Sequence, residues 1–124
     1  MKNQELIYLT KKLLGYHGEI LKKFEATKEA KIEGDFFQEV RPFSNEVKDI
    51  MDQWLVEVIA WINTCRPRNI HAQQMDSVVE QLGMIAVQAF FPQTSRTRFI
   101  NTAQSVEYVL TAVLLETEKD QIES

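Results

Sequence analysis

The sequence has little cysteine, proline and glycine, and each shortage narrows what the chain can form. Cys65 is the only cysteine, so an internal disulfide is impossible. Three prolines and four glycines among 124 residues leave few places for turns or for a flexible linker. We therefore expect a single domain over residues 1–124, built from a few long elements.

Long apolar runs and an excess of basic residues are also missing. No stretch approaches the roughly 20 apolar residues of a membrane span, and early charges such as Lys2 and Glu5 do not fit a signal peptide. These absences predict a cytoplasmic protein without a membrane partner. The net charge of −4 predicts no nucleic-acid partner, because such a surface needs a basic patch.

The common catalytic and metal-binding motifs are absent as well. A di-metal site in a helical bundle needs Glu-x-x-His pairs on two helices, and the sequence has none. We expect His17, in the middle of a helix, to be packed or semi-exposed. Cys65 and His71 are six residues apart, but nothing supplies an orienting group or an oxyanion hole, so Cys65 is expected to be inert packing. We therefore predict no catalytic residue, no metal ligand and no cofactor.

Four segments with a helical spacing of apolar residues make up most of the chain. The expected helices cover residues 3–31, 36–64 with a break near Pro42, 70–91 and 95–119. Because the connectors are short, consecutive helices should be antiparallel neighbours. The sequence therefore predicts an all-α fold, an up-and-down antiparallel four-helix bundle.

The apolar positions on each segment define the expected core. The rows are Leu6, Leu9, Leu13, Tyr16, Ile20 and Phe24; Val47, Ile50, Trp54, Val58 and Trp61 beside Met51, Leu55, Ile59 and Ile62; Met75, Val78, Leu82, Ile85 and Ala89; and Phe99, Val106, Val109 or Leu110, and Val113. The two adjacent rows on the second segment predict a helix that contacts two neighbours.

Capping chemistry predicts where the helices begin and end. Gly34 is expected to take the left-handed conformation that ends the first helix, and Asp35 to cap the turn that follows. Pro42 should kink or restart the chain, so that the main helix begins near Ser44. The expected N-caps of the other helices are Asn3, Asn69, and Thr94 or Ser95.

The topology also predicts that opposite charges meet at both ends of the bundle. Residues 1–31 carry seven lysines and four glutamates, whereas residues 32–64 carry two basic and seven acidic residues. At the end with the chain termini, the expected neighbours are Arg66 and Arg68 with Glu116, Glu118 and Asp120. At the other end, they are Arg96 and Arg98 with Glu33 and Asp35.

Two regions are candidates for a functional surface. Phe36 and Phe37 are adjacent, so both cannot face inward on a helix. The outer ring belongs either to a partner surface or to packing beside the Pro42 break. The Arg66-Pro67-Arg68 corner could bind an anion at the N-terminus of the third helix, or its arginines could form salt bridges to the acidic tail; Arg98 has the same two alternatives. The candidate surface residues from this reasoning are Phe36, Phe37, Arg66, Arg68 and Arg98.

A series of residues between Asp35 and Tyr108 carries a resemblance to a known family. The series is Asp35-Phe36-Phe37, Arg41-Pro42, Glu46, Trp54, Arg66-Pro67, His71, Gln74, Gln88, Arg98-Phe99, Ser105-Val106 and Tyr108. It resembles the YppE-like family of small uncharacterised proteins from Bacillus and related Firmicutes, over roughly residues 35–113. The resemblance implies an up-and-down four-helix bundle and brings no activity with it. It also singles out His71 and Gln74, which join the candidate surface residues; with Arg66 they could form a ligand or partner surface, or only the corner between two helices.

These observations favour a binding protein over an enzyme. We expect an uncharacterised helical-bundle protein that acts by binding a protein partner or by self-association. The alternative is a small-molecule- or metal-binding enzyme that uses the corner from Arg66 to Gln74.

Overall fold

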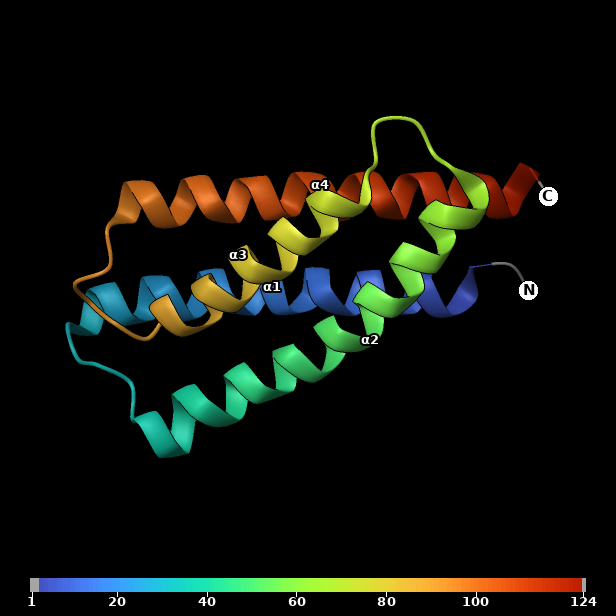
Figure 1. Cartoon of the computed structure of the whole chain (residues 1–124). Helices are drawn as coiled ribbons and strands as arrows, with labels where there is room; N and C mark the ends of the chain where they lie inside the picture. Colours follow the sequence, from blue (N-terminus) through green and yellow to red (C-terminus); the bar gives the residue numbers. More distant parts are fainter. Residues whose placement is uncertain (1–2, 124) are drawn as a thin grey trace.

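Four long α-helices run alternately up and down the molecule (Figure 1). The computed structural model describes the backbone of residues 3–123 and the side chains of residues 3–119. The helices are α1 (Gln4–Ala30), α2 (Arg41–Cys65), α3 (Ala72–Gln88) and α4 (Arg96–Glu123), and a short π-helix, η1 (Phe36–Val40), leads into α2. The predicted all-α, up-and-down four-helix bundle is confirmed.

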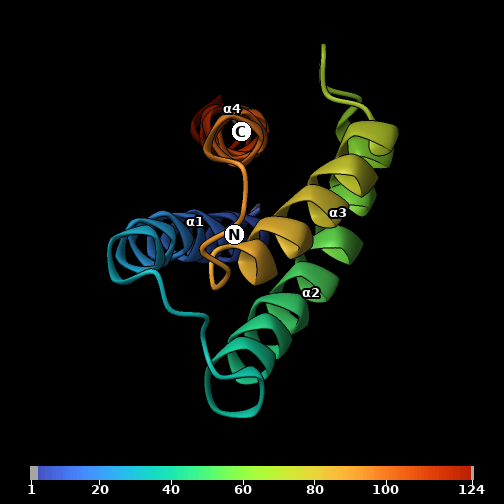
Figure 2. The same cartoon turned by 90° about the vertical axis from the view of Figure 1, so that its left-hand side faces the viewer.

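The helices form two crossed pairs. α1 lies beside α4, and the α2–α3 hairpin crosses this pair diagonally, as the end-on view in Figure 2 shows. α1 also contacts α2, and α3 also contacts α4, so the packing closes into a ring. Among the described helices, none carries an apolar stretch suited to crossing a bilayer.

The apolar rows of the sequence form the core. All six residues of the first row and all five of the third are buried. On α2, the buried line is Val47, Met51, Trp54, Val58 and Trp61, while Ile50, Leu55, Ile59 and Ile62 are partly buried against it. On α4, Leu110 is fully buried and Val109 only partly, which decides between the two alternatives. α1 and α4 are joined by Phe24 and Phe99, whose rings stack 3.9 Å apart.

Two polar side chains of α1 are buried with hydrogen-bond partners on other helices. The Thr10 hydroxyl accepts from the Trp54 indole N–H (2.9 Å) and donates to the Leu6 carbonyl (2.7 Å). His17 is 4% exposed, and its Nε2 lies 2.8 Å from the Ala103 carbonyl on α4. Of the two expected states of His17, packed or semi-exposed, the structure shows the packed one. Thr10 also belongs to the core, although the spacing of apolar residues does not predict it.

Gly34 has a different role from the one expected. Lys31 takes the left-handed conformation (φ 59°) that ends α1, and Gly34 does not have a positive φ. Instead the Gly34 N–H donates to the Phe90 carbonyl (2.9 Å), and a Cβ at this position would lie 2.6 Å from Phe90 Cδ1. Glycine is needed here because a larger residue would collide with the Phe90 side chain.

The break expected near Pro42 takes the form of a change of helix type. η1 ends at Val40 and α2 begins at Arg41 without an intervening loop, so Pro42 lies in the first turn of α2, a position that tolerates its missing N–H. The predicted start near Ser44 is therefore wrong by one helical turn. Asp35 caps the π-helix as expected: its carboxylate accepts from the Gln38 N–H (2.8 Å).

The other caps differ in part from the predictions. Asn3 precedes α1, but its side-chain amide donates to the Thr117 carbonyl (3.4 Å) and so reaches across to α4. α3 begins after His71 instead of Asn69. At α4, the Arg98 N–H donates to Ser95 Oγ (3.4 Å), whereas the Thr94 hydroxyl donates to the Gln88 carbonyl at the end of α3.

Candidate functional site

His71 and Gln74 build the start of α3. The His71 N–H donates to Gln74 Oε1 (2.8 Å), and the Gln74 N–H donates back to the His71 carbonyl (3.0 Å). Two residues in the left-handed backbone conformation, Arg66 (φ 47°) and Asn69 (φ 62°), turn the chain before this point. The backbone N–H of His71 and the side-chain amide oxygen of Gln74 are therefore used in forming the corner.

The structure does not place Cys65 and His71 in one pocket. A hollow of about 520 Å³ lies at the corner, lined by His71, Arg66 and Pro67 among others. Cys65 is half-buried and lines a separate hollow with Trp61 and the first residues of α1. Within residues 3–119, no cluster of three or more His, Cys, Asp or Glu side chains is arranged to hold a metal ion.

Arg68 lies beside α4, at the end of the bundle with the termini. It lines a groove of about 790 Å³ with Tyr108, Leu115 and Glu116. Glu116 lines the same groove as Arg68, but among the described side chains it forms no ion pair with Arg66 or Arg68, and Glu118 is paired with Lys11 (3.6 Å). The side chain of Asp120 lies outside the described residues.

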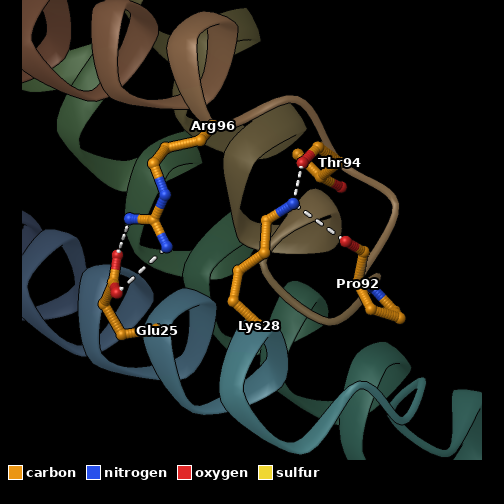
Figure 3. Close-up of polar contacts among 5 residues, drawn as sticks. All are labelled: Glu25, Lys28, Pro92, Thr94 and Arg96. Carbon is orange, nitrogen blue, oxygen red and sulfur yellow. Dashed lines mark hydrogen bonds and ion pairs between the residues drawn. The ribbon is translucent and has the colours of Figure 1, made fainter.

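At the opposite end, the predicted partners of Arg96 and Arg98 are wrong. Arg96 donates to the Glu25 carboxylate of α1 from both terminal guanidinium nitrogens, Nη1 (2.5 Å) and Nη2 (3.3 Å), as Figure 3 shows. Glu33 accepts from the Gln93 amide (3.4 Å), and Asp35 is used as a cap. Arg98 is exposed and has no ion pair within the part of the chain whose side chains are described. Opposite charges do meet at this end, but they join α4 to α1, through Arg96 and Glu25, and not α4 to the segment between α1 and α2.

Lys28 holds the connector between α3 and α4. Its ammonium donates to the Pro92 carbonyl (2.8 Å) and to the Thr94 carbonyl (Figure 3). The contacts are partly buried, so they fix the path of the chain at this corner. Together with the Arg96–Glu25 pair, they give the charged residues at this end a structural role.

Phe36 and Phe37 form an exposed aromatic pair on η1. Phe36 is 55% exposed and Phe37 is 71% exposed, and their rings meet edge to face at 5.1 Å. The turn beneath them is held at its start, because Asp35 accepts from Gln38 and the Asp35 N–H donates to Glu39 Oε1 (3.0 Å). We call these two residues, Phe36 and Phe37, the aromatic-turn surface.

A groove lies next to this surface, between α1 and the first turns of α2. One part, of about 630 Å³, is lined by Lys23, Phe43, Asp49 and Phe90 among others, and it reaches Gln38, Glu39 and Pro42 beside the aromatic turn. A second part, of about 460 Å³, includes Tyr16 and Gly15. Glu46 lines both parts, so we treat them as one α1–α2 groove.

Aromatic rings and carboxylates give the α1–α2 groove its chemistry. Phe43 meets Tyr16 (6.0 Å) and Phe90 (5.9 Å) edge to face, and Lys23 Nζ lies 4.9 Å from the Phe43 ring centre and 5.5 Å from that of Phe90. Burial, and secondly the charge of Glu46, raises the pKa of the Tyr16 hydroxyl above its usual value.

Sequence reasoning missed the α1–α2 groove. Its members come from α1, η1, α2 and the segment that follows α3, so no local spacing connects them. The exposed aromatic pair was found because two adjacent phenylalanines cannot both be buried on one helix.

Comparison with known proteins places the chain in a family. A family model described as a bacterial domain of unknown function (DUF1798) matches residues 10–117. The chain is similar to the uncharacterized protein YppE of Bacillus subtilis (strain 168), with 24% identity over 122 residues that cover 98% of this chain and 95% of YppE.

Solved structures of similar proteins have the same fold as this chain. A Listeria innocua protein of unknown function has a TM-score of 0.92 at 29% identity, over 98% of this chain and 97% of that one. The crystal structure of YppE has a TM-score of 0.91 at 22% identity, over 98% of both chains, which supports the fold. The chain therefore belongs to the DUF1798, or YppE-like, family of bacterial proteins of unknown function.

Proposed function

We propose that the protein acts by binding a protein partner through the aromatic-turn surface. The observation that carries the proposal is the exposure of Phe36 and Phe37 on a turn held by hydrogen bonds. Two of the eight exposed large hydrophobic side chains of the described residues belong to this surface, at adjacent positions of the sequence, and their rings are in contact. Apolar side chains gathered in this way are typical of an interaction site, and aromatic rings are enriched there.

The order of the turn supports the proposal. A protein that binds through preset rings loses less conformational entropy than one that must first arrange a loose loop. Here the Asp35 and Glu39 caps fix the turn before any partner arrives. The cytoplasmic location, which rests on the sequence, stays a prediction.

Site-specific photo-crosslinking tests the proposal. A photoreactive phenylalanine analogue at position 37 should form a discrete crosslinked product in the native host, whereas the same analogue at position 56 should not. Val56 is a matched control because it is 69% exposed but lies on the outer face of α2.

The captured protein is then purified, and its affinity is measured by calorimetry for the wild type, Phe37→Ser and Val56→Ser. We expect Phe37→Ser to weaken binding by about tenfold or more, because buried aromatic anchors dominate such interfaces. Sedimentation shows whether the partner is a second copy of the chain. Equal crosslinking at both positions, or equal affinities of the two variants, would contradict the proposal.

A further inference from the structure

The α1–α2 groove already holds one positively charged side chain against aromatic rings. Lys23 Nζ lies over both Phe43 (4.9 Å) and Phe90 (5.5 Å). These rings are held at fixed angles, since Phe43 is packed edge to face against Tyr16 and Phe90. The faces of aromatic rings attract cations, so the floor of the groove suits an ammonium or guanidinium group.

The rim of the groove is acidic beyond what Lys23 balances. Glu39, Glu46 and Asp49 line the same part of the groove as Lys23, and all three carboxylates are exposed. Glu39 is used in the cap of the turn, and neither Glu46 nor Asp49 forms an ion pair with another described side chain. The second part of the groove adds the exposed Glu19 and Lys12, so four carboxylates stand against two ammonium groups in the groove as a whole. The groove therefore presents an excess of negative charge beside a ring pair that accepts a cation.

We propose that the α1–α2 groove binds a lysine or arginine side chain of a basic segment in a partner protein, which displaces Lys23 from Phe43 and Phe90. The proposal deepens the proposed function and rests on it, because the groove reaches the aromatic turn at Gln38 and Pro42. A segment that lays apolar side chains on Phe36 and Phe37 can place a neighbouring basic one in the groove. Lys23 then acts as an internal competitor.

The test uses three synthetic 12-residue peptides that alternate leucine with arginine, glutamine or glutamate. Binding to the isotope-labelled full chain is followed by amide chemical shifts in NMR titrations. The arginine peptide should shift the amides of Lys23, Phe43 and Glu46, and the glutamate peptide should not. Binding should weaken when salt rises from low to high concentration, because the rim charges are exposed to screening.

Lys23→Met separates the proposal from a general attraction of charges. It removes the competing cation and keeps an apolar stem, so it should tighten binding of the arginine peptide by about threefold to tenfold. The matched control is Lys22→Met, which removes an exposed charge from the neighbouring position outside the groove. The double variant Glu46→Gln/Asp49→Gln should weaken binding by a similar factor, whereas Glu80→Gln on α3 should not.

Several results would overturn the proposal. The glutamine peptide could bind as tightly as the arginine peptide, the shifts could lie outside the groove, or Lys23→Met and Lys22→Met could behave alike. Absence of binding by the arginine peptide at millimolar concentration, or dimerisation through the groove, would also overturn it. If position 37 captures a partner whose affinity is unchanged by Lys23→Met and by Glu46→Gln/Asp49→Gln, the cation site fails and the proposed function stands. If position 37 captures nothing, the proposed function itself fails.

Discussion

The Thr10 hydroxyl joins α1 to α2 inside the core. It accepts the hydrogen bond of the Trp54 indole N–H, and the Trp54 side chain is fully inaccessible to solvent. A buried donor without an acceptor costs far more than an apolar replacement of both groups. The pair therefore contributes most by keeping the indole satisfied.

Thr10→Val should lower the free energy of unfolding by about 1–3 kcal/mol, because it keeps the shape of the side chain and strands the Trp54 N–H. Urea unfolding monitored by circular dichroism measures the change. Thr117→Val is the matched control: Thr117 is also fully buried, but its hydroxyl bonds only to the carbonyls of Val113 and Leu114 in its own helix. An equal loss in both variants would refute the special role of Thr10.

The close contact between Gly34 and Phe90 makes a prediction about stability. Gly34→Ala should destabilise the protein, since its Cβ would lie 2.6 Å from a carbon of Phe90, which is only 4% exposed. Gly15→Ala should have the opposite sign and stabilise by up to about 1 kcal/mol, because alanine is the better helix former and nothing lies within 4 Å of the new Cβ. Thermal unfolding of both variants checks the two signs, and stabilisation by Gly34→Ala would contradict the packing described above.

Tyr16 predicts how stability changes in alkali. Burial and the charge of Glu46 raise the pKa of its hydroxyl in the folded protein. Its contribution to stability is therefore complete below the ordinary tyrosine pKa of about 10 and is lost as the pH rises through the folded value. The wild type should lose more stability than Tyr16→Phe between pH 8 and pH 11 in parallel urea titrations. Identical losses would show that Tyr16 titrates alike in both states.

At the scale of elements, the connector between α3 and α4 depends on a side chain from α1. Lys28 donates to two connector carbonyls in a partly buried position, while the Arg96–Glu25 pair beside it is more than half exposed. Hydrogen bonds from a charged group to partly buried acceptors are stronger than exposed ion pairs. The lysine should therefore matter more than the arginine.

Lys28→Met is expected to lower the free energy of unfolding by about 1–3 kcal/mol, whereas Glu25→Gln should change it much less because its ion pair is exposed to solvent. Urea unfolding measures both, and amide hydrogen exchange at residues 93–95 should become faster in Lys28→Met alone. A larger effect from Glu25→Gln would reverse the assigned order.

The helices themselves could be predicted well from the sequence, and their joints less well. Core rows follow from a spacing of three or four, which is a local property, and so the rows of α1 and α3 are correct throughout. The joints depend on what lies across the fold. Gly34 faces Phe90, and Asn3 bonds to Thr117, so neither could be assigned correctly from neighbouring residues. The sequence places the start of the main helix one turn too late, at Ser44, because the position of Pro42 in the first turn of α2 depends on the π-helix that precedes it.

For the whole molecule, the closed ring of helix contacts predicts one cooperative unit. Both tryptophans lie on α2, which packs on α1 and α3, while the helical signal comes from all four helices. Tryptophan fluorescence and far-ultraviolet circular dichroism should therefore give coincident urea transitions. Two separated transitions would mean that one crossed pair unfolds without the other.

The candidate surface could be predicted only in part. Phe36 and Phe37 were identified because their adjacency is visible in the sequence, and their exposure agrees with that reasoning. Lys23 and Phe90 meet only after the chain has folded, so the groove had no sequence signal. The family resemblance points to His71 and Gln74, and in the structure the hydrogen bond between them forms the start of α3.

The direction in which Phe36 and Phe37 point depends on the number of residues in the π-helical turn before α2. In η1 the amides of Val40 and Arg41 bond five residues back instead of four, so the turn contains one residue more than an α-helical turn would. Deleting a residue such as Gln38 would restore the α-helical phase and rotate everything before it by about 100° around the helix axis. The helix would remain and the rings would persist, but they would point to a different side of the molecule.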